Sequence, residues 1–177
     1  MEILDTLKTL PAFSGFSPEE LEYLAQHIQQ TQYAEGQAIL QEGTLNDAMY
    51  ILVNGIVEIR KKFGGQEVVV AELMPGNFLG EGGLLAPEAK KTTVMAIAKT
   101  PAEALVIHRS FLETAAQEMP MAAIKLLRSV ALLLSQKVRS VDEAYVKLFM
   151  ESRGIQNISE LQELQGLLAK EWSLPEN

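Results

Sequence analysis

The chain has 177 residues, of which 47% are hydrophobic, and its 15 basic and 23 acidic side chains give a net charge of −8. This composition is typical of a folded globular protein and excludes a disordered chain, and the acidic balance argues against a basic nucleic-acid module. Because there is no cysteine and the two histidines, His27 and His108, lie far apart, disulfides, thiolate metal sites and histidine-rich metal centres are also excluded.

The first 29 residues are predicted to form two helices. Leu4, Leu7 and Leu10 recur at helical spacing before Pro11, which ends the first helix. Residues 17–20 have the features of a second helix start, namely a serine that can cap, a proline in the first turn and two acids at the positive helix end.

Residues 30–107 are predicted to form short antiparallel strands. Apolar or alternating runs occupy residues 38–40, 48–53, 56–60, 67–73, 93–97 and 104–107. Asn54-Gly55 and Gly64-Gly65 are dipeptides typical of hairpin turns. Closely spaced strands joined by tight turns indicate an antiparallel sandwich or barrel rather than a parallel sheet.

Residues 109–150 are predicted to be helical again, with a longer helix beginning at Pro120. One apolar stripe of this helix, the heptad seam, consists of Ile124, Leu127, Ala131, Leu134, Val138, Val141, Tyr145 and Leu148. A second stripe consists of Leu126, Val130 and Leu133. Because the barrel can bury only one stripe, we expect a second copy of the chain to cover the heptad seam over residues 124–148 and form a homodimer. The alternative is packing within one chain.

The sequence organisation indicates one domain over residues 1–150 and a short helical tail over residues 151–177. The tail breaks at Gly154 and resumes with a capping box, Ser159 to Gln162, ahead of a run of leucines. The N-terminus lacks the basic start of a signal peptide, and the longest apolar runs fall well below the roughly 20 residues that cross a bilayer. We therefore expect a cytoplasmic protein without a membrane partner.

Residues 76–85 are the most informative segment, because glycines surround Glu81 there and Lys90 and Lys91 follow. Glycines let backbone N–H groups converge on an anion, and a lysine can add charge to the same anion. A carboxylate beside such a group of amides suits a sugar hydroxyl, since it accepts hydrogen bonds. The alternative is an ordinary turn followed by solvated lysines.

This segment resembles the phosphate-binding cassette of cyclic nucleotide-binding domains, as in catabolite activator-like regulators and cyclic-nucleotide-dependent kinases. Gly80-Glu81 match the cassette, Gly82-Gly83-Leu84 match it loosely with Gly83 where alanine is common, and Lys90 takes the position of an arginine. Upstream, the spacing of Tyr33, Gly36, Ile39, Gly43, Asp47, Tyr50 and Gly55 also matches the family. The resemblance covers about residues 4–150. It implies a mainly β fold, an eight-stranded antiparallel jelly roll (double-stranded β-helix) with N-terminal helices and a long C-terminal dimerisation helix.

The resemblance also implies a site for a cyclic nucleotide such as cAMP or cGMP, without a metal. Glu81 would accept from the ribose 2′-hydroxyl, and the backbone of Gly82, Gly83 and Leu84 would hold the cyclic phosphate. Lys90 would pair with that phosphate, and Ser135 on the long helix would contact the base. The predicted ligand-binding residues are Gly80, Glu81, Gly82, Gly83, Leu84, Lys90, Lys91, Thr92 and Ser135.

Lysine in place of arginine is the main departure from the family pattern. A lost charge-assisted hydrogen bond costs about 1.5–3 kcal/mol, so the pocket could bind weakly, bind another anion or bind nothing. The leading interpretation is a regulatory sensor domain that binds a cyclic nucleotide or a related anion and signals through a dimer helix. The alternative is a degenerate, non-binding jelly roll that acts as a dimerisation or interaction scaffold.

An enzymatic role is not expected, because no second carboxylate or histidine lies near Glu81 in the cassette. A cupin-like enzyme on the same fold would need a cluster of histidines. The 27 residues after Met150 are too few for a helix-turn-helix domain, so we expect no specific nucleic-acid binding by this chain, which is a standalone module or part of a larger protein.

Overall fold

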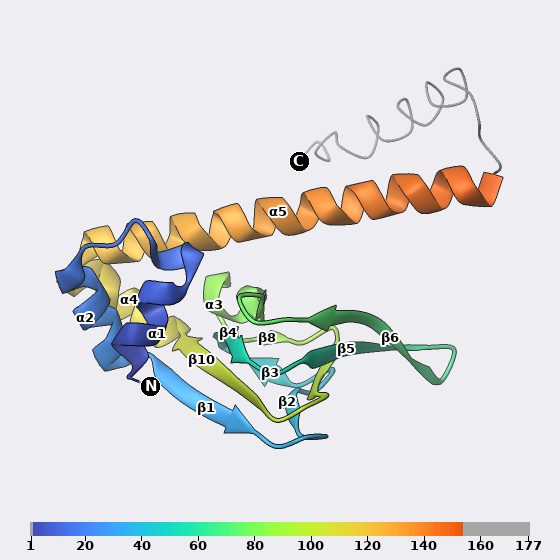
Figure 1. Ribbon diagram of the computed structural model, residues 1–177, viewed down its shortest axis with the longest axis horizontal. Coiled ribbons are helices and arrows are strands. Elements are labelled where there is room, and N and C mark those ends of the chain that lie inside the picture. Colours follow the sequence, from blue (N-terminus) through green and yellow to red (C-terminus); the bar gives the residue numbers. More distant parts are fainter. Residues whose placement is uncertain (1, 154–177) are drawn as a thin grey trace. The chain divides into compact units, whose positions relative to one another are not determined.

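The computed structural model describes residues 2–153 and begins with the two helices expected from the sequence (Figure 1). Helix α1 spans Ile3–Thr9, and helix α2 spans Pro18–His27 after the single turn η1 at Pro11–Phe13. Ser17 caps α2 through a capping box: the N–H of Glu20 donates to Ser17 Oγ at 3.3 Å, and the N–H of Ser17 donates to Glu20 Oε2 at 2.6 Å. Both N–H groups would otherwise lack a partner within the helix.

The strands follow between residues 29 and 108 of the described chain. They are β1 (Gln29–Tyr33), β2 (Ala38–Leu40), β3 (Leu45–Asn46), β4 (Ala48–Asn54), β5 (Val57–Phe63), β6 (Gln66–Leu73), β7 (Phe78–Leu79), β8 (Lys90–Lys91), β9 (Met95–Ala98) and β10 (Ala102–His108). Helix α3 (Glu81–Leu85) lies between β7 and β8. All six predicted strands are present, β2 with the predicted bounds and the other five with shifted ends, whereas β1, β3, β7 and β8 were not predicted.

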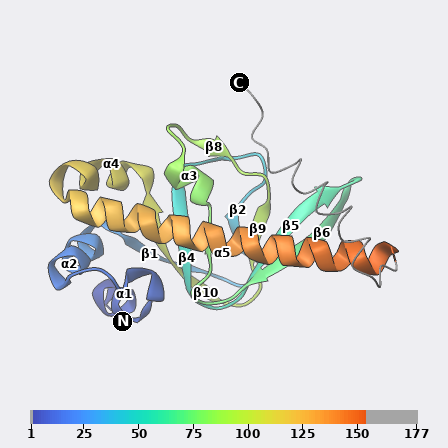
Figure 2. The same ribbon diagram turned by 90° about the horizontal axis from the view of Figure 1, so that it is seen from above.

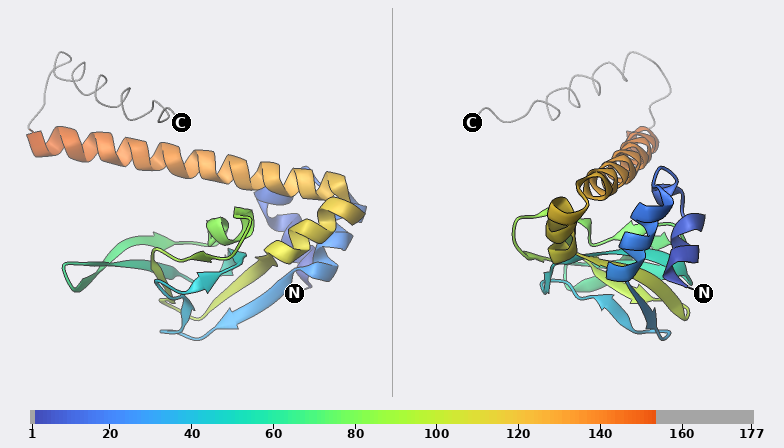
Figure 3. Two further views of the ribbon diagram at one scale, coloured as in Figure 1. Left: turned by 180° about the vertical axis from the view of Figure 1, so that it is seen from behind. Right: turned by 90° about the vertical axis from the view of Figure 1, so that its left-hand side faces the viewer.

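Two four-stranded antiparallel sheets contain most of these strands, in the orders β1-β10-β4-β7 and β2-β9-β5-β6, and β3 pairs with β8. Both sheets contribute to one buried cluster, which consists of Leu40, Leu52, Val57, Leu79, Ala96, Ala98 and Ala102. The core therefore lies between the sheets, and the mainly β jelly-roll fold with flanking helices is confirmed. Figures 1 and 3 show α1, α2 and α4 (Arg109–Glu118) at one end of the sheets and the β5–β6 hairpin at the other.

The two turns predicted as hairpins have different roles. Gly64-Gly65 joins β5 to β6, which pair from Phe63 and Gln66 onward, and both glycines have positive φ. The prediction of a hairpin at Asn54-Gly55 is wrong, because β4 and β5 belong to different sheets. A Cβ on Gly55 would lie 2.4 Å from the carbonyl oxygen of Pro101, so only glycine lets the chain pass this corner between the sheets.

Helices α4 and α5 (Pro120–Arg153) complete the described chain, and both were predicted. The chain divides after Ala131, within α5, into two compact units. The domain limit at residue 150 stays a prediction, and the predicted capping box and leucines of the tail lie outside the described residues. Over residues 2–153, no helix combines the length and apolar character needed to cross a membrane.

The first part of α5 docks on the N-terminal helices of its own unit. Leu126 and Val130, which belong to the second stripe, are each 1% exposed. Lys125 Nζ donates to Glu20 Oε2 at 2.6 Å, and Ser129 Oγ donates to the carbonyl of Ala12 at 2.6 Å. Two residues of the second stripe are therefore buried within the chain at this end, where the helix also bonds to α2 and η1 and not to the barrel strands named in the prediction.

The ion pair between Glu20 and Lys125 should make stability depend on pH. The hydrogen bond from Lys125 is the largest influence on the Glu20 carboxyl and lowers its pKa below the ordinary 4.5, although burial opposes the change. A lowered folded-state pKa stabilises the protein above the unfolded-state pKa, and this contribution is lost as pH falls through the folded-state value. Glu20→Gln should lower the free energy of unfolding at neutral pH by about 1 kcal/mol, because Lys125 is partly exposed and screened.

Urea denaturation at a series of pH values measures this effect. The difference between wild type and Glu20→Gln should shrink as pH falls below about 4.5. Glu19→Gln is the matched control, since Glu19 is the exposed neighbour of Glu20 on α2. Equal effects of the two substitutions, or a pH-independent difference, would contradict the assignment of the pair.

Candidate functional site

The segment with the predicted ligand residues begins at a glycine that the fold requires. Gly80 links β7 to α3 with φ 77°, in the left-handed region. A Cβ at this position would lie 2.7 Å from the carbonyl oxygen of Ala48 and 3.1 Å from Cδ2 of Tyr50. Both the backbone conformation and the space admit only glycine, and this fixes the direction in which the chain enters α3.

Helix α3 exposes its first residues and buries the next two. Glu81 is half-buried, Gly82 is exposed, and a Cβ on Gly82 would meet nothing within 4 Å. Gly83 and Leu84 are buried, and the Leu84 side chain belongs to the apolar interior at 1% exposure. Any contact of Leu84 with a polar ligand would therefore come from its backbone, as the sequence analysis proposed for this residue.

Lys90 and Lys91 form the short strand β8, which pairs with β3. In this register Lys90 lies opposite Asn46 and Lys91 opposite Leu45, and both lysines are exposed. Figure 2 shows α3 beside β8. Because successive side chains of a strand point to opposite faces, the two lysines face in different directions. They form a matched pair for testing which one serves the site.

Thr92 follows β8, and its polar groups bind the neighbouring turn. Its hydroxyl donates to the carbonyl of Gln41, its N–H donates to the carbonyl of Thr44 at 2.9 Å, and its own carbonyl accepts from Gly43 N–H at 2.8 Å. The residue thus ties β8 to the turn before β3. Its contact with a ligand stays a prediction.

Asn46 is a residue of this region that the sequence analysis missed. It is 8% exposed, and its Nδ2 donates to the carbonyl of Ala48 at 2.6 Å and to the carbonyl of Gly80 at 3.3 Å. Its backbone lies opposite Lys90. One residue therefore joins the start of α3 to the strand with the lysines. Asn46-Asp47, three residues after Gly43, resembles an ordinary polar turn, so the sequence holds no signal for this role.

Tyr33 and Tyr50, which pack against the buried cluster between the sheets, stay uncharged at physiological pH. Burial raises the pKa of the Tyr50 phenol, and the nearby Asp47 carboxylate raises it further. Burial also raises the pKa of Tyr33, and Tyr50 adds to that rise. Both tyrosines pack against the buried cluster between the sheets, and the Tyr50 hydroxyl donates to Asn46 Oδ1 at 3.4 Å.

Ser135 lies on α5 in the second unit and is exposed. Its position relative to α3 is not determined, because α3 belongs to the first unit. The contact between Ser135 and a nucleotide base therefore stays a prediction.

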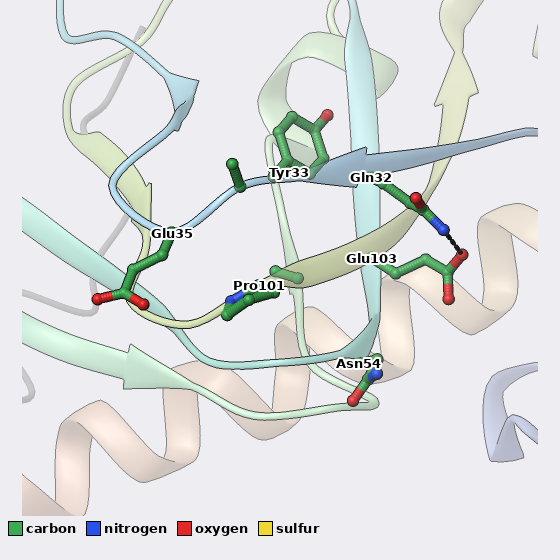
Figure 4. Close-up of a pocket in the computed structure, with 8 residues that line it drawn as sticks. Gln32, Tyr33, Glu35, Asn54, Pro101 and Glu103 are labelled. Atoms are coloured by element: carbon green, nitrogen blue, oxygen red, sulfur yellow. Dashed lines mark hydrogen bonds between the residues drawn. The ribbon is translucent and has the colours of Figure 1, made fainter.

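A hollow of about 530 Å³ lies where β1 ends and β10 begins (Figure 4). Its lining consists of Gln32, Tyr33, Ala34, Glu35, Asn54, Pro101, Ala102 and Glu103. Glu103 Oε1 already accepts hydrogen bonds from Gln30 at 2.7 Å and Gln32 at 3.3 Å. None of the predicted ligand residues lines this hollow. Within the part of the chain that the structure describes, no three His, Cys, Asp or Glu side chains group to hold a metal ion.

The fold and the segment from Gly80 to Thr92 together define a jelly-roll domain in which a glycine leads into a short helix that is followed by a strand with two lysines. The family profile described as Cyclic nucleotide-binding domain matches residues 30–119. The Cyclic AMP receptor protein of Thermus thermophilus is 31% identical over 149 residues, which cover 83% of this chain and 66% of that protein. The chain belongs to the cyclic nucleotide-binding domain family, and the resemblance found in the sequence is confirmed.

Two further comparisons extend this result. The cAMP-dependent protein kinase regulatory subunit of Mycosarcoma maydis is 31% identical over 94 residues, which cover 53% of this chain and 18% of that protein. A solved cyclic nucleotide-binding domain from Methylobacillus flagellatus KT has a TM-score of 0.70 at 24% identity, covering 85% of this chain and 82% of that chain; it supports the fold. This chain spans about two thirds of the Thermus protein and less than a fifth of the Mycosarcoma protein.

Proposed function

We propose that this regulatory domain binds a cyclic nucleotide at the start of α3, beside β8. The observation that carries the proposal is the geometry of α3, where a required glycine leads to a half-buried Glu81 and an accessible backbone at Gly82. Glu81 would accept from the ribose 2′-hydroxyl, and backbone groups of Gly82, Gly83 and Leu84 would hold the cyclic phosphate. The Gly83 N–H donates to the Gly80 carbonyl at 2.9 Å, so its contact with a phosphate would replace that bond. Lys90 would neutralise part of the phosphate charge.

Cyclic AMP is the first ligand to test, since the names of both curated relatives refer to it. Thermal or chemical denaturation with cAMP and cGMP should reveal stabilisation of about 2.7 kcal/mol at 100 times the dissociation constant. The 5′-monophosphates AMP and GMP are controls that lack the cyclic ester. If neither cyclic nucleotide binds in calorimetry or stabilises the chain, the pocket is degenerate and the domain acts as a scaffold.

Replacing Lys90 with arginine should tighten cyclic nucleotide binding by up to tenfold. Arginine offers two parallel hydrogen bonds to a phosphate, whereas lysine acts as a point charge. Lys91→Arg, on the opposite face of β8, is the comparison variant and should change affinity less than Lys90→Arg, because the two side chains face in different directions. Titration calorimetry measures both variants. A gain with Lys91→Arg and none with Lys90→Arg would move the cationic position by one residue.

We also propose that two copies of the chain pair through the heptad seam over residues 124–148. In the first unit, Ile124 and Leu127 are 56% and 41% exposed, while Leu126 and Val130 are buried. The exposed apolar residues of the seam in the second unit are Val138 at 53%, Val141 at 61%, Tyr145 at 51% and Leu148 at 65%. Apolar residues at heptad spacing that a single chain leaves in water favour a helix–helix interface between two copies.

The proposed output is signalling through this paired helix, in the cytoplasm, with a small molecule as the input. Catalysis, metal binding, nucleic-acid binding and membrane binding are not part of the proposal. The scaffold alternative keeps the paired helix but predicts no effect of any cyclic nucleotide. Calorimetry with the ligand and light scattering without it therefore separate the two functions.

A further inference from the structure

Asn46 and Gly83 lie far apart in the sequence but in direct contact in the fold. A Cβ on Gly83 would lie 2.3 Å from Asn46 Nδ2, 2.9 Å from the Asn46 carbonyl oxygen and 3.0 Å from the backbone nitrogen of Ala48. Both residues are buried. The side-chain amide of Asn46 therefore occupies the volume that a side chain at position 83 would need, and the pair sets how closely α3 approaches β3 and β4.

The hydrogen bonds of Asn46 determine how its side-chain amide is oriented. Nδ2 donates to the carbonyls of Ala48 and Gly80, whereas Oδ1 accepts from the Ala48 N–H at 3.3 Å and from the Tyr50 hydroxyl at 3.4 Å. The two ends of the amide thus have opposite requirements, because carbonyls need a donor and the N–H and hydroxyl need an acceptor. An aspartate of the same shape could satisfy only one end.

We propose that Asn46 is a positioning residue of the nucleotide site and that Gly83 is its required partner. Asn46 contacts no ligand itself. Its amide holds the carbonyl of Gly80 and rests against Gly83, so that the Glu81 carboxylate and the first N–H groups of α3 keep their place. In the pairing of β3 with β8, the backbone of Asn46 lies opposite Lys90, so Asn46 is also linked to the strand that carries the lysine. The effect on affinity rests on the proposed function, but the effect on α3 is measurable without ligand.

Asn46→Asp tests the donor end of the amide. The carboxylate would face the carbonyls of Ala48 and Gly80 at hydrogen-bond distance, so we expect α3 to shift and cAMP affinity to fall at least tenfold. Asn54→Asp is the matched control, because the exposed Asn54 uses only its acceptor, from Gly55 N–H at 2.8 Å, and a carboxylate keeps that bond. It should change affinity by less than twofold.

A double-mutant cycle without any added charge tests the pairing with Gly83. Gly83→Ala alone should weaken binding at least tenfold, because its methyl group meets the Asn46 amide. Asn46→Ala removes that amide and should restore part of the loss when combined with Gly83→Ala. The rescue should be incomplete, because the methyl group would still lie 2.9 Å from the carbonyl oxygen of residue 46 and 3.0 Å from the Ala48 nitrogen. The affinity of the double variant should be at least fivefold higher than the affinity expected if the two single fold-changes simply multiplied. If the affinity of the double variant equals the value expected from independent single effects, Asn46 and Gly83 are not coupled and the proposed pairing is wrong.

Amide NMR spectra of the ligand-free protein separate this inference from the proposed function. Asn46→Asp should shift the signals of residues 80–85, and Asn54→Asp should leave them in place. If the wild type binds no cyclic nucleotide, the function fails, and these spectra still decide the positioning role. If the wild type binds a cyclic nucleotide and Asn46→Asp changes neither the α3 signals nor the affinity, the positioning role fails while the function stands. The same holds if the double-mutant cycle shows no coupling between positions 46 and 83.

Discussion

Replacing Glu81 with alanine is expected to weaken cAMP binding by ten- to a hundredfold. The proposed hydrogen bond between its carboxylate and the ribose 2′-hydroxyl is charge-assisted and contributes about 1.5–3 kcal/mol. The fold should tolerate this change, because the buried residues of α3 are Gly83 and Leu84 and not Glu81. Titration calorimetry gives the affinity, and thermal unfolding without ligand verifies that the domain is intact.

A ligand that lacks the hydroxyl makes this test specific. The wild type should bind 2′-deoxy-cAMP about as weakly as Glu81→Ala binds cAMP, and Glu81→Ala should bind the two ligands alike. Glu88→Ala is the matched control, since it removes the same charge from an exposed position of the connection between α3 and β8. Equal losses from Glu81→Ala and Glu88→Ala would indicate a general charge effect and not a hydrogen bond to the ribose.

Placing a glutamate at Val138 is expected to convert a dimer into a monomer. Val138 belongs to the heptad seam and is 53% exposed within one chain, so the substitution should not destabilise the single copy. Across a two-fold axis the same change places two carboxylates in a desolvated interface, where unpaired charges are strongly unfavourable. Light scattering after size exclusion, at micromolar concentration, measures the mass of each form.

The control for this experiment is Gln136→Glu, which adds the same charge to an exposed position on another face of α5. It should leave the dimer intact. A wild type that is monomeric at the same concentration would contradict the proposed pairing. A dimer that survives Val138→Glu would show that the two copies meet through some other surface.

Much of the fold followed from local features of the sequence. A capping serine, a proline in the first turn and helical spacing of leucines located α1 and α2, because helix signals act within one or two turns. Gly64-Gly65 correctly located the β5–β6 hairpin, since a two-residue turn needs residues that adopt positive φ. The family resemblance rested on glycines and apolar residues at fixed spacing, and the profile match over residues 30–119 confirms it.

The errors share a physical cause, which is that pairing between distant strands leaves little trace in a short segment. Strands β3, β7 and β8 have two residues each, too few to show any periodicity. Strand β1 is a polar edge strand of its sheet, so its composition resembles a loop. Asn54-Gly55 has the sequence of a hairpin, but tertiary packing directs β4 and β5 into different sheets.

The sequence by itself determined the glycine-bounded segment with Glu81 and the two lysines, because local composition decides where a backbone can approach an anion. Only the tertiary structure placed Asn46 between Gly80, Gly83 and Lys90, through a side-chain contact on one side and a strand register on the other. The packing of a buried amide depends on the atoms that long-range folding brings around it. No pattern of neighbours along the chain specifies those atoms.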